Sequence, residues 1–303
     1  MTRAQLINQI HLKKSYLCVG LDSDLSKIPT HLLTQADPVF EFNKQIIDAT
    51  RDLCVAYKIN TAFYEAMGWK GWETMEKTVR YIGDEHFKIA DAKRGDIGNT
   101  SSQYAKAFFE ALPFDSITVA PYMGEDSVRP FLAYDGKWAI VLGLTSNSGA
   151  KDFELKQLKP NNNIAVDDTG NKNIIQDKMV GGNKMVGGDT NHGASNFLYE
   201  QVLSTVSEWG TPDNLMFVVG ATRAEEFTSI RQLTPHNFYL VPGVGAQGGS
   251  LREISEKAMI KKDIGLLVNV SRAIIYASEK EDFIKEARAI ALQYKVEMAG
   301  YLR

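Results

Sequence analysis

A short stretch of the chain, residues 89–100, gathers side chains suited to catalysis. Asp91 and Lys93 follow a mostly apolar run, residues 87–90, which predicts a buried strand. Because side chains alternate along a strand, this carboxylate and this ammonium are expected to point to the same side. Asp96 comes just past the strand, after Gly95, a residue that permits a tight turn. Desolvating paired charges costs about as much as their attraction returns, so this pattern indicates a catalytic site rather than a packed core.

The elements that must position these residues form a regular repeat. Short apolar runs that predict strands alternate with segments of helical periodicity. The predicted strands are residues 16–22, 54–60, 87–90, 116–120, 138–144, 215–220, 238–241 and 265–270. The predicted helices are residues 2–13, 38–52, 67–82, 101–112, 195–209, 224–233, 251–260 and 279–299. This α/β pattern favours a closed (β/α)8 TIM barrel in a single domain, residues 1–303, with an open doubly wound sheet as the alternative.

One segment interrupts the repeat after the fifth strand. Residues 160–192 are polar, rich in Asn, Gly and Asp, and contain no Phe, Trp or Tyr. Loops of this length inside a compact domain are usually functional or disordered. The composition predicts a mobile insertion, and the alternative is an ordered lid over the barrel face that carries active sites.

The overall composition excludes several classes of protein. The chain has 303 residues, of which 44% are hydrophobic and 23% charged, and its net charge is -3. Without a basic patch, nucleic acid is not the expected partner. No apolar run approaches the ~20 residues of a membrane span, and the N-terminal residues do not resemble a signal peptide. Cys18 and Cys54 lie in apolar runs typical of reduced core cysteines, so a cytoplasmic enzyme is expected.

Polar residues collect where the predicted strands end, which is where parallel barrels place catalytic groups. These positions hold Asp22, Lys58, Asn60, Asp91, Lys93, Asp96, residues 145–149, Asn269, Ser271 and Arg272. Lys58, Asp91, Lys93 and Asp96 predict an alternating cluster that keeps every group ionised, because each charge has opposite neighbours. Taken singly, they have structural alternatives: an aspartate can cap the next helix, and Lys58 can lie along the barrel wall.

A glycine-rich run after the seventh strand predicts a phosphate site. Gly243, Gly245, Gly248 and Gly249 allow backbone amides to approach an anion, and a helix is predicted to begin at Leu251. Arg272, at the end of the next strand, can add a bidentate contact. The alternative is a plain tight turn and a solvated arginine.

Taken in order, these motifs resemble the orotidine 5'-phosphate decarboxylase family, in its longer, second bacterial subfamily. Residues 91–100, DAKRGDIGNT, match the signature D-x-K-x-x-D-I, and residues 58–65, KINTAFYE, match the same subfamily. Further matches are VGLD at 19–22, LTSN at 144–147, PGVGAQGG at 242–249 and VSRAI at 270–274. The resemblance covers nearly the whole chain outside residues 160–192.

The resemblance implies decarboxylation of orotidine 5'-phosphate to UMP, the last step of de novo pyrimidine synthesis, without a metal or organic cofactor. Lys93 would protonate C6 of the pyrimidine and Asp91 would lie against the leaving carboxylate, with Lys58 and Asp96 completing a charged tetrad. Asp96 would reach into the neighbouring subunit's site, which implies a homodimer. The remaining implied substrate contacts are Asp22, Asn60 and Thr100 for the ribose and substrate, Ser146 for the pyrimidine edge, and Gln247 with Arg272 for the phosphate.

Related barrels supply the competing hypotheses. Sugar-phosphate decarboxylases and hexulose-phosphate synthases share D-x-K-x-x-D but use Mg²⁺, which needs oxygen ligands where Lys58 puts an ammonium. A class I aldolase would form a Schiff base on Lys58 or Lys93, but paired carboxylates keep lysines protonated and poorly nucleophilic. A non-catalytic phosphate-binding barrel would keep the glycine run and Arg272 but would not need the four charges.

Overall fold

Eight parallel strands close into a barrel in the computed structural model, which describes residues 1–158, 164–166, 172–174, 197–245 and 248–302. Around the barrel the strands follow the order β1-β10-β9-β8-β5-β4-β3-β2. Their bounds are β1 Leu17–Leu21, β2 Ala56–Asn60, β3 Phe87–Arg94, β4 Ser116–Val119, β5 Trp138–Leu144, β8 Leu215–Val219, β9 Phe238–Pro242 and β10 Leu266–Val270. The expected (β/α)8 barrel is confirmed, and each predicted strand has its counterpart. The third strand is longer than predicted, because residues 91–94, three of which are charged, continue it.

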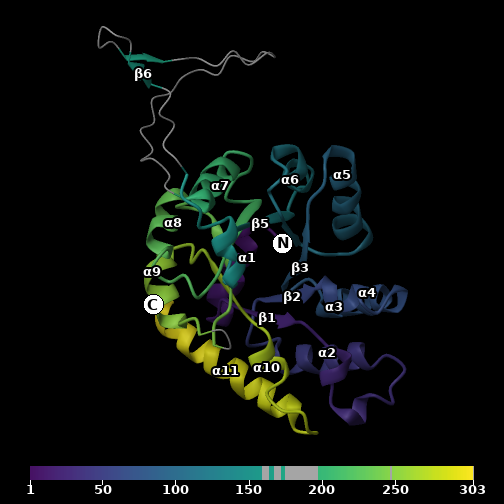
Figure 1. Cartoon of the computed structure of the whole chain (residues 1–303). Coiled ribbons are helices and arrows are strands. Elements are labelled where there is room, and N and C mark those ends of the chain that lie inside the picture. Colours follow the sequence, from purple (N-terminus) through teal and green to yellow (C-terminus); the bar gives the residue numbers. More distant parts are fainter. Residues whose placement is uncertain (159–163, 167–171, 175–196, 246–247, 303) are drawn as a thin grey trace.

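Helices encircle the strands (Figure 1). They are α1 Arg3–Lys13, α2 Pro38–Thr50, α3 Thr61–Glu65, α4 Trp69–Ile82, α5 Gly98–Lys106, α6 Glu125–Leu132, α7 Leu198–Ser207, α8 Phe227–Leu233, α9 Leu251–Ala258, α10 Arg272–Ile275 and α11 Phe283–Tyr301, with a π-helical turn, η3, at Ala107–Ala111. The sequence analysis missed α3, α6 and α10. Two of them are only a turn or so long, and α6 contains Pro130, which argues against a helix when only the sequence is read. None of the described helices combines the length and hydropathy needed to cross a membrane.

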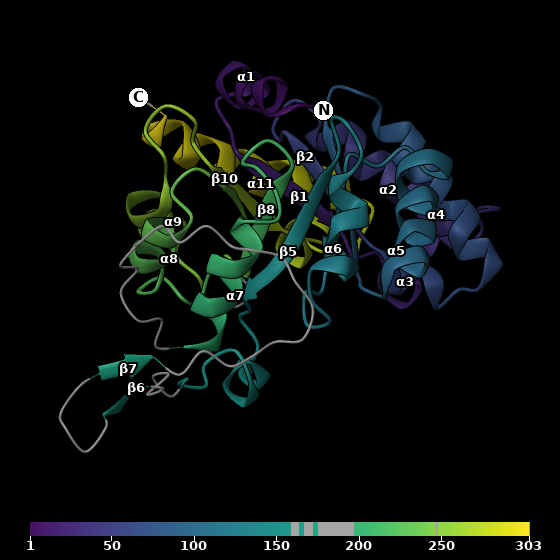
Figure 2. The same ribbon diagram turned by 90° about the horizontal axis from the view of Figure 1, so that it is seen from above.

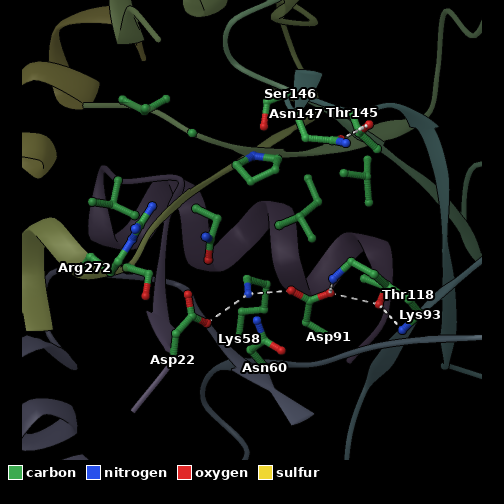
Figure 3. A pocket seen from close by; sticks show the side chains of 18 of the residues that line it. Asp22, Lys58, Asn60, Asp91, Lys93, Thr118, Thr145, Ser146, Asn147 and Arg272 are labelled. Atoms are coloured by element: carbon green, nitrogen blue, oxygen red, sulfur yellow. Dashed lines mark hydrogen bonds and ion pairs between the residues drawn. The ribbon is translucent and has the colours of Figure 1, made fainter. Parts of the chain in front are cut away.

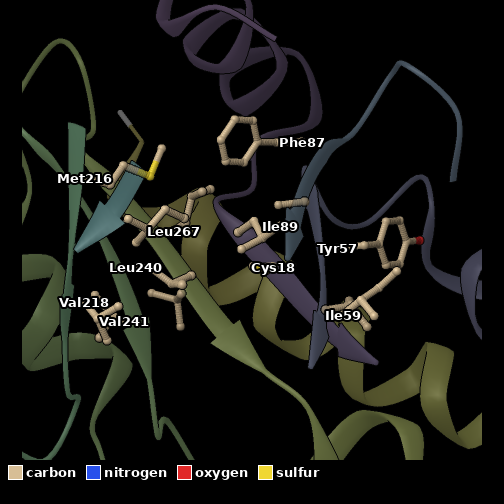
Figure 4. Packing of buried hydrophobic residues seen from close by; sticks show 14 of the residues in the cluster. Cys18, Tyr57, Ile59, Phe87, Ile89, Met216, Val218, Leu240, Val241 and Leu267 are labelled. Atoms are coloured by element: carbon tan, nitrogen blue, oxygen red, sulfur yellow. The ribbon is translucent and has the colours of Figure 1, made fainter. Parts of the chain in front are cut away.

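Apolar side chains fill the interior of the barrel. Ile89, Met216 and Leu267 are fully buried and Leu240 is nearly so, and all four belong to the packed cluster in Figure 4. A fully buried Leu, Ile or Met side chain contributes about 1.5–3 kcal/mol to stability. This packing makes the barrel a rigid support for the side chains at its strand ends.

Helix α1 covers the amino-terminal end of the barrel. The amino group of Met1 pairs with Asp115 at 2.6 Å, and the Trp138 indole donates to the Met1 carbonyl at 2.9 Å. Arg3 donates to the Pro212 carbonyl at 2.8 Å. These partners lie at or just before the starts of β4, β5 and β8. Figure 2 shows α1 at one end of the barrel with β5 running away from it, so the carboxyl ends of the strands lie at the opposite end.

A buried histidine lies at this amino-terminal end, just before β3. His86 is 1% exposed, and its Nε2 lies 2.7 Å from the Lys13 ammonium. The same ammonium donates to the carbonyls of Arg51 at 2.8 Å and Cys54 at 3.0 Å. Burial, reinforced by the positive charge of Lys13, lowers the pKa of His86 to about 4.

This shift predicts acid sensitivity of the fold. Between pH 6.5 and about 4 the unfolded chain protonates His86 and the folded chain does not, so the free energy of unfolding falls as pH falls. The full effect is about 3 kcal/mol. Urea unfolding at several pH values in this range measures the free energy of unfolding of wild type and of His86→Gln. This free energy should fall more steeply with pH in wild type. Parallel curves for the two proteins would contradict the assignment.

The segment after β5 contains one local pairing that the sequence analysis did not predict. Strands β6, Ile164–Val166, and β7, Lys172–Ile174, form a two-stranded antiparallel sheet. The prediction of a mobile insertion at 160–192 otherwise concerns residues outside the described part of the chain. The assignment of residues 1–303 to one domain also stays a prediction.

Candidate active site

A pocket of about 320 Å³ opens at the carboxyl ends of the barrel strands (Figure 3). One side is polar and is built from β1 to β4 and β10, whereas Leu142, Val218 and Leu240 form an apolar wall from β5, β8 and β9. The polar lining residues are Asp22, Lys58, Asn60, Asp91, Lys93, Thr118, Thr145, Ser146, Asn147, Asn269, Ser271 and Arg272. Such a cavity suits a small ligand with one polar and one apolar side.

A continuous chain of opposite charges crosses the polar side. The Lys58 ammonium lies 2.7 Å from Asp91 and 3.4 Å from Asp22. The Lys93 ammonium lies 2.6 Å from the other oxygen of Asp91. Lys58 and Asp91 are largely buried, at 4% and 12% exposure of their side chains, whereas Lys93 is 52% exposed. Of the two lysines in this cluster, Lys93 is therefore the one that is more open to a ligand.

The surroundings keep the central pair of charges ionised. Burial alone would lower the pKa of Lys58, but the carboxylates of Asp91 and Asp22 outweigh it and raise that pKa above its usual value. Burial alone would raise the pKa of Asp91, but Lys58 and Lys93 hold it well below the usual range. Both residues thus remain charged across the physiological pH range.

Lys93 reaches Asp91 through an irregular backbone, not through simple alternation along a strand. The pairing of β3 with β4 shifts register between Ala90 and Arg94, and Lys93 has a left-handed φ of 47°. The Lys93 amide donates to the Thr118 hydroxyl at 2.9 Å, and that hydroxyl donates to Asp91 at 3.1 Å. The expectation that a period of two orients both side chains is therefore corrected: a bulge and Thr118 orient them.

Asp96 does not join this cluster within one chain. It does not line the pocket, and its carboxylate accepts a hydrogen bond from the Ile97 amide at 2.7 Å. Within one chain the second carboxylate beside Lys58 is Asp22, and a place for Asp96 in the tetrad, across a subunit interface, stays a prediction. Thr100 likewise lies outside the pocket, exposed on α5. Gly95 is required because a Cβ there would lie 2.8 Å from the Ala120 carbonyl oxygen, not because of a positive φ.

Only one of the residues predicted to bind phosphate lines the pocket in the described part of the chain. Arg272 lines the pocket, is exposed, and forms no ion pair with any residue that the structure describes. Gly245, Gly248 and Gly249 do not line it, and their amides donate to carbonyls within the same loop at 3.2, 2.9 and 3.1 Å. The Ser250 side chain caps the first turn of α9. Gln247 lies outside the described residues.

Other residues complete the lining. Asn60 reaches the pocket and also caps α3, its side-chain oxygen accepting from the Ala62 amide at 3.3 Å. Ser146 lies on the loop after β5, opposite Lys58 in Figure 3. Thr118 was missed as a site residue, and Asn269 was expected at a strand end but was given no role. The signal for Thr118 was its place near the carboxyl end of β4, since residues that point into the barrel there line the pocket.

A protein-family model matches most of this sequence. The family model described as orotidine 5'-phosphate decarboxylase / HUMPS family matches residues 15–287. This match includes the cluster of charges and Arg272.

Individual relatives match along the full length. The orotidine 5'-phosphate decarboxylase of Flavobacterium johnsoniae is 55% identical over 302 residues, which are 99% of this chain and 97% of that protein. The corresponding protein of Bacteroides fragilis is 49% identical over 306 residues, covering 100% of this chain and 99% of its own. The structure of Leishmania donovani OMP decarboxylase superposes with a TM-score of 0.72 at 30% identity, covering 98% of this chain and 99% of that one.

Proposed function

This chain belongs to the orotidine 5'-phosphate decarboxylase / HUMPS family, and from that membership and its pocket we propose that it converts orotidine 5'-phosphate to UMP and CO₂. The observation that carries the proposal is the chain of charges Lys58–Asp91–Lys93 at one side of the pocket. Arg272 lies at the other end of the pocket from Lys93 (Figure 3). A substrate with a phosphate at one end and a carboxylated ring at the other matches this arrangement.

Binding begins with the two anionic ends of the substrate. The Arg272 guanidinium holds the phosphate, and the pyrimidine lies between the polar side and the apolar wall of Leu142, Val218 and Leu240. Asp22 and Asn60 bind the ribose, and Ser146 binds the edge of the base. This placement brings C6 and its carboxylate to Asp91 and Lys93.

The chemical step uses only side chains of this fold. The bond between C6 and the carboxylate breaks, CO₂ leaves, and the electron pair stays on C6. The Lys93 ammonium stabilises this developing negative charge and then transfers a proton to C6, giving UMP. Asp91 holds the Lys93 ammonium in place through their ion pair, and Lys58 with the Thr118 hydroxyl fixes the Asp91 carboxylate in turn.

The direct test is product analysis. Purified protein incubated with orotidine 5'-phosphate should release UMP and CO₂ in equal amounts. An unchanged substrate, or turnover of a pentulose or hexulose phosphate instead, would reject the proposal in favour of a binding barrel or the other branch of the family.

The proposal includes a homodimer in the cytoplasm, with Asp96 and Thr100 contributed to the partner subunit's site. Two observations support this: both residues lie outside the pocket of their own chain, and large exposed side chains occur on the same loop and on the next one. Ile97 is 62% exposed and Tyr122 is 90% exposed, on the neighbouring loops after β3 and β4. Exposed apolar groups gathered beside a strand-end loop are typical of an interface.

Arg272 supplies a specific prediction for phosphate recognition. Arg272→Ala should lower kcat/KM for orotidine 5'-phosphate about 100-fold, because about two charge-assisted hydrogen bonds are lost. The same variant should leave kcat/KM for orotidine, which has no phosphate, unchanged. Steady-state kinetics with both substrates measures the difference. Equal losses for the two substrates would show that Arg272 does not bind the phosphate.

A further inference from the structure

Arg94, the last residue of β3, has an unusual set of contacts for a residue beside the proposed proton donor. Its guanidinium forms an ion pair with Glu65, and its Nη1 donates to the Ala92 carbonyl at 3.2 Å. The guanidinium carbon lies 5.4 Å from the ring centre of Tyr104 and 5.7 Å from that of Phe108. The Arg94 side chain is 21% exposed, so these contacts are shielded from water.

These contacts tie together elements from two successive repeats of the barrel. Glu65 ends α3, the short helix that begins directly after Asn60 at the end of β2. Tyr104 lies on α5, and Phe108 lies on the π-helical turn η3 that follows it. π-helical turns are rare and often occur near functional sites. Arg94 thus braces the end of β3 against α3, which follows β2, and against α5 and η3, which follow β3.

The backbone beside Arg94 needs such a brace. Lys93 adopts a left-handed φ of 47°, which is unfavourable for a residue other than glycine. On one side the Lys93 amide is held by Thr118. On the other side the Arg94 carbonyl accepts from the Ala120 amide at 2.9 Å, and its side chain makes the contacts described above.

We propose that Arg94 is a positioning residue: anchored by Glu65, Tyr104 and Phe108, it holds Lys93 in the left-handed conformation that points the ammonium at the reacting carbon. The inference rests on the proposed function insofar as Lys93 is the proton donor. Arg94 itself does not line the pocket. It should therefore affect the chemical step and leave ground-state binding nearly unchanged.

The test compares turnover with UMP binding in Arg94→Met, which keeps an apolar stem but removes the guanidinium. We expect kcat to fall about 100-fold, the size of effect produced by a misplacement of about 1 Å. The dissociation constant for UMP should stay within about threefold, since UMP needs no proton from Lys93. Arg94→Lys should recover part of the lost kcat, and Glu65→Gln should lower kcat in a fully folded protein.

A double variant and a matched control sharpen the result. Arg94→Met combined with Glu65→Gln should be no slower than Arg94→Met alone, because both changes remove the same brace. Arg80→Met removes an ordinary surface pair, in which Arg80 lies 2.8 Å from Glu76 on α4, and should leave kcat unchanged. Wild-type kcat in Arg94→Met, or parallel losses of kcat and UMP affinity, would overturn the inference.

A crystal structure of Arg94→Met gives a readout independent of turnover. We expect Lys93 to leave the left-handed region, and an unchanged φ at Lys93 would also overturn the inference. If wild-type protein fails to turn over orotidine 5'-phosphate, the proposed function fails while this structural result still decides the role of Arg94.

Discussion

Lys93→Ala should abolish decarboxylation, lowering kcat about 10⁴-fold or more, while UMP still binds. The reason is that one group performs two tasks: its charge stabilises the carbanion at C6, and its proton ends the reaction. The fold should tolerate the change, because the Lys93 side chain is 52% exposed and buries little surface. UMP should bind through Arg272 and the ribose contacts, none of which involves Lys93.

Single-turnover kinetics with orotidine 5'-phosphate and calorimetric titration with UMP measure the two quantities separately. Lys77→Ala is a suitable control, since Lys77 forms an exposed pair with Glu73 on α4 at 2.8 Å. Lys77→Ala should behave as wild type in both measurements. Near-normal turnover in Lys93→Ala would remove the basis for the mechanism.

Mixing two inactive variants should restore activity if Asp96 acts across a dimer interface. Lys93→Ala and Asp96→Ala should each be severely impaired as homodimers, because every site lacks one member of the tetrad. In a one-to-one mixture about half of the dimers contain one subunit of each kind. One of the two sites in such a dimer then has both Lys93 and Asp96, so about one quarter of all sites should be active.

Co-expression of the two variants with different affinity tags, followed by purification through both tags, isolates the mixed dimers. Their kcat per dimer should approach half of the wild-type value. A mixture of Lys93→Ala and Arg272→Ala is the matched control: both residues lie in one chain's own pocket, so each site of a mixed dimer still lacks one of them and mixing should not raise kcat/KM above the mean of the two variants. If the Lys93/Asp96 mixture stays inactive, Asp96 serves its own subunit's site.

The sequence predicted the parts of this site that depend on strand order and strand ends. Lys58 and Asp91 lie where apolar runs end, and in a parallel barrel the ends of such strands carry the site residues. The order of eight strands then brings Arg272 to the same pocket, because β10 closes the barrel against β1. These features follow from local periodicity, which a sequence displays directly.

What the sequence did not predict depends on contacts between distant segments. The left-handed conformation of Lys93 arises from the bulge between β3 and β4 and from the hydroxyl of Thr118, 25 residues away. Asp22, not Asp96, completes the charge cluster of one chain, because β1 lies beside β2. No local pattern carries this information.

The glycine run illustrates a different limit. Its composition indicates that side chains are not tolerated, but not for what reason. At Gly249 the reason is packing, since a Cβ there would lie 2.3 Å from the Cβ of Ala221. A role in phosphate binding therefore stays a proposal for this loop, whereas Arg272 faces the pocket directly.

The central claim is that this chain decarboxylates orotidine 5'-phosphate with its own side chains. The most direct measurement follows the absorbance of orotidine 5'-phosphate in the presence of purified protein, with and without EDTA. We predict a steady loss of absorbance at the same rate in both samples, with UMP as the product. No loss of absorbance, or a loss that EDTA stops, would contradict the account.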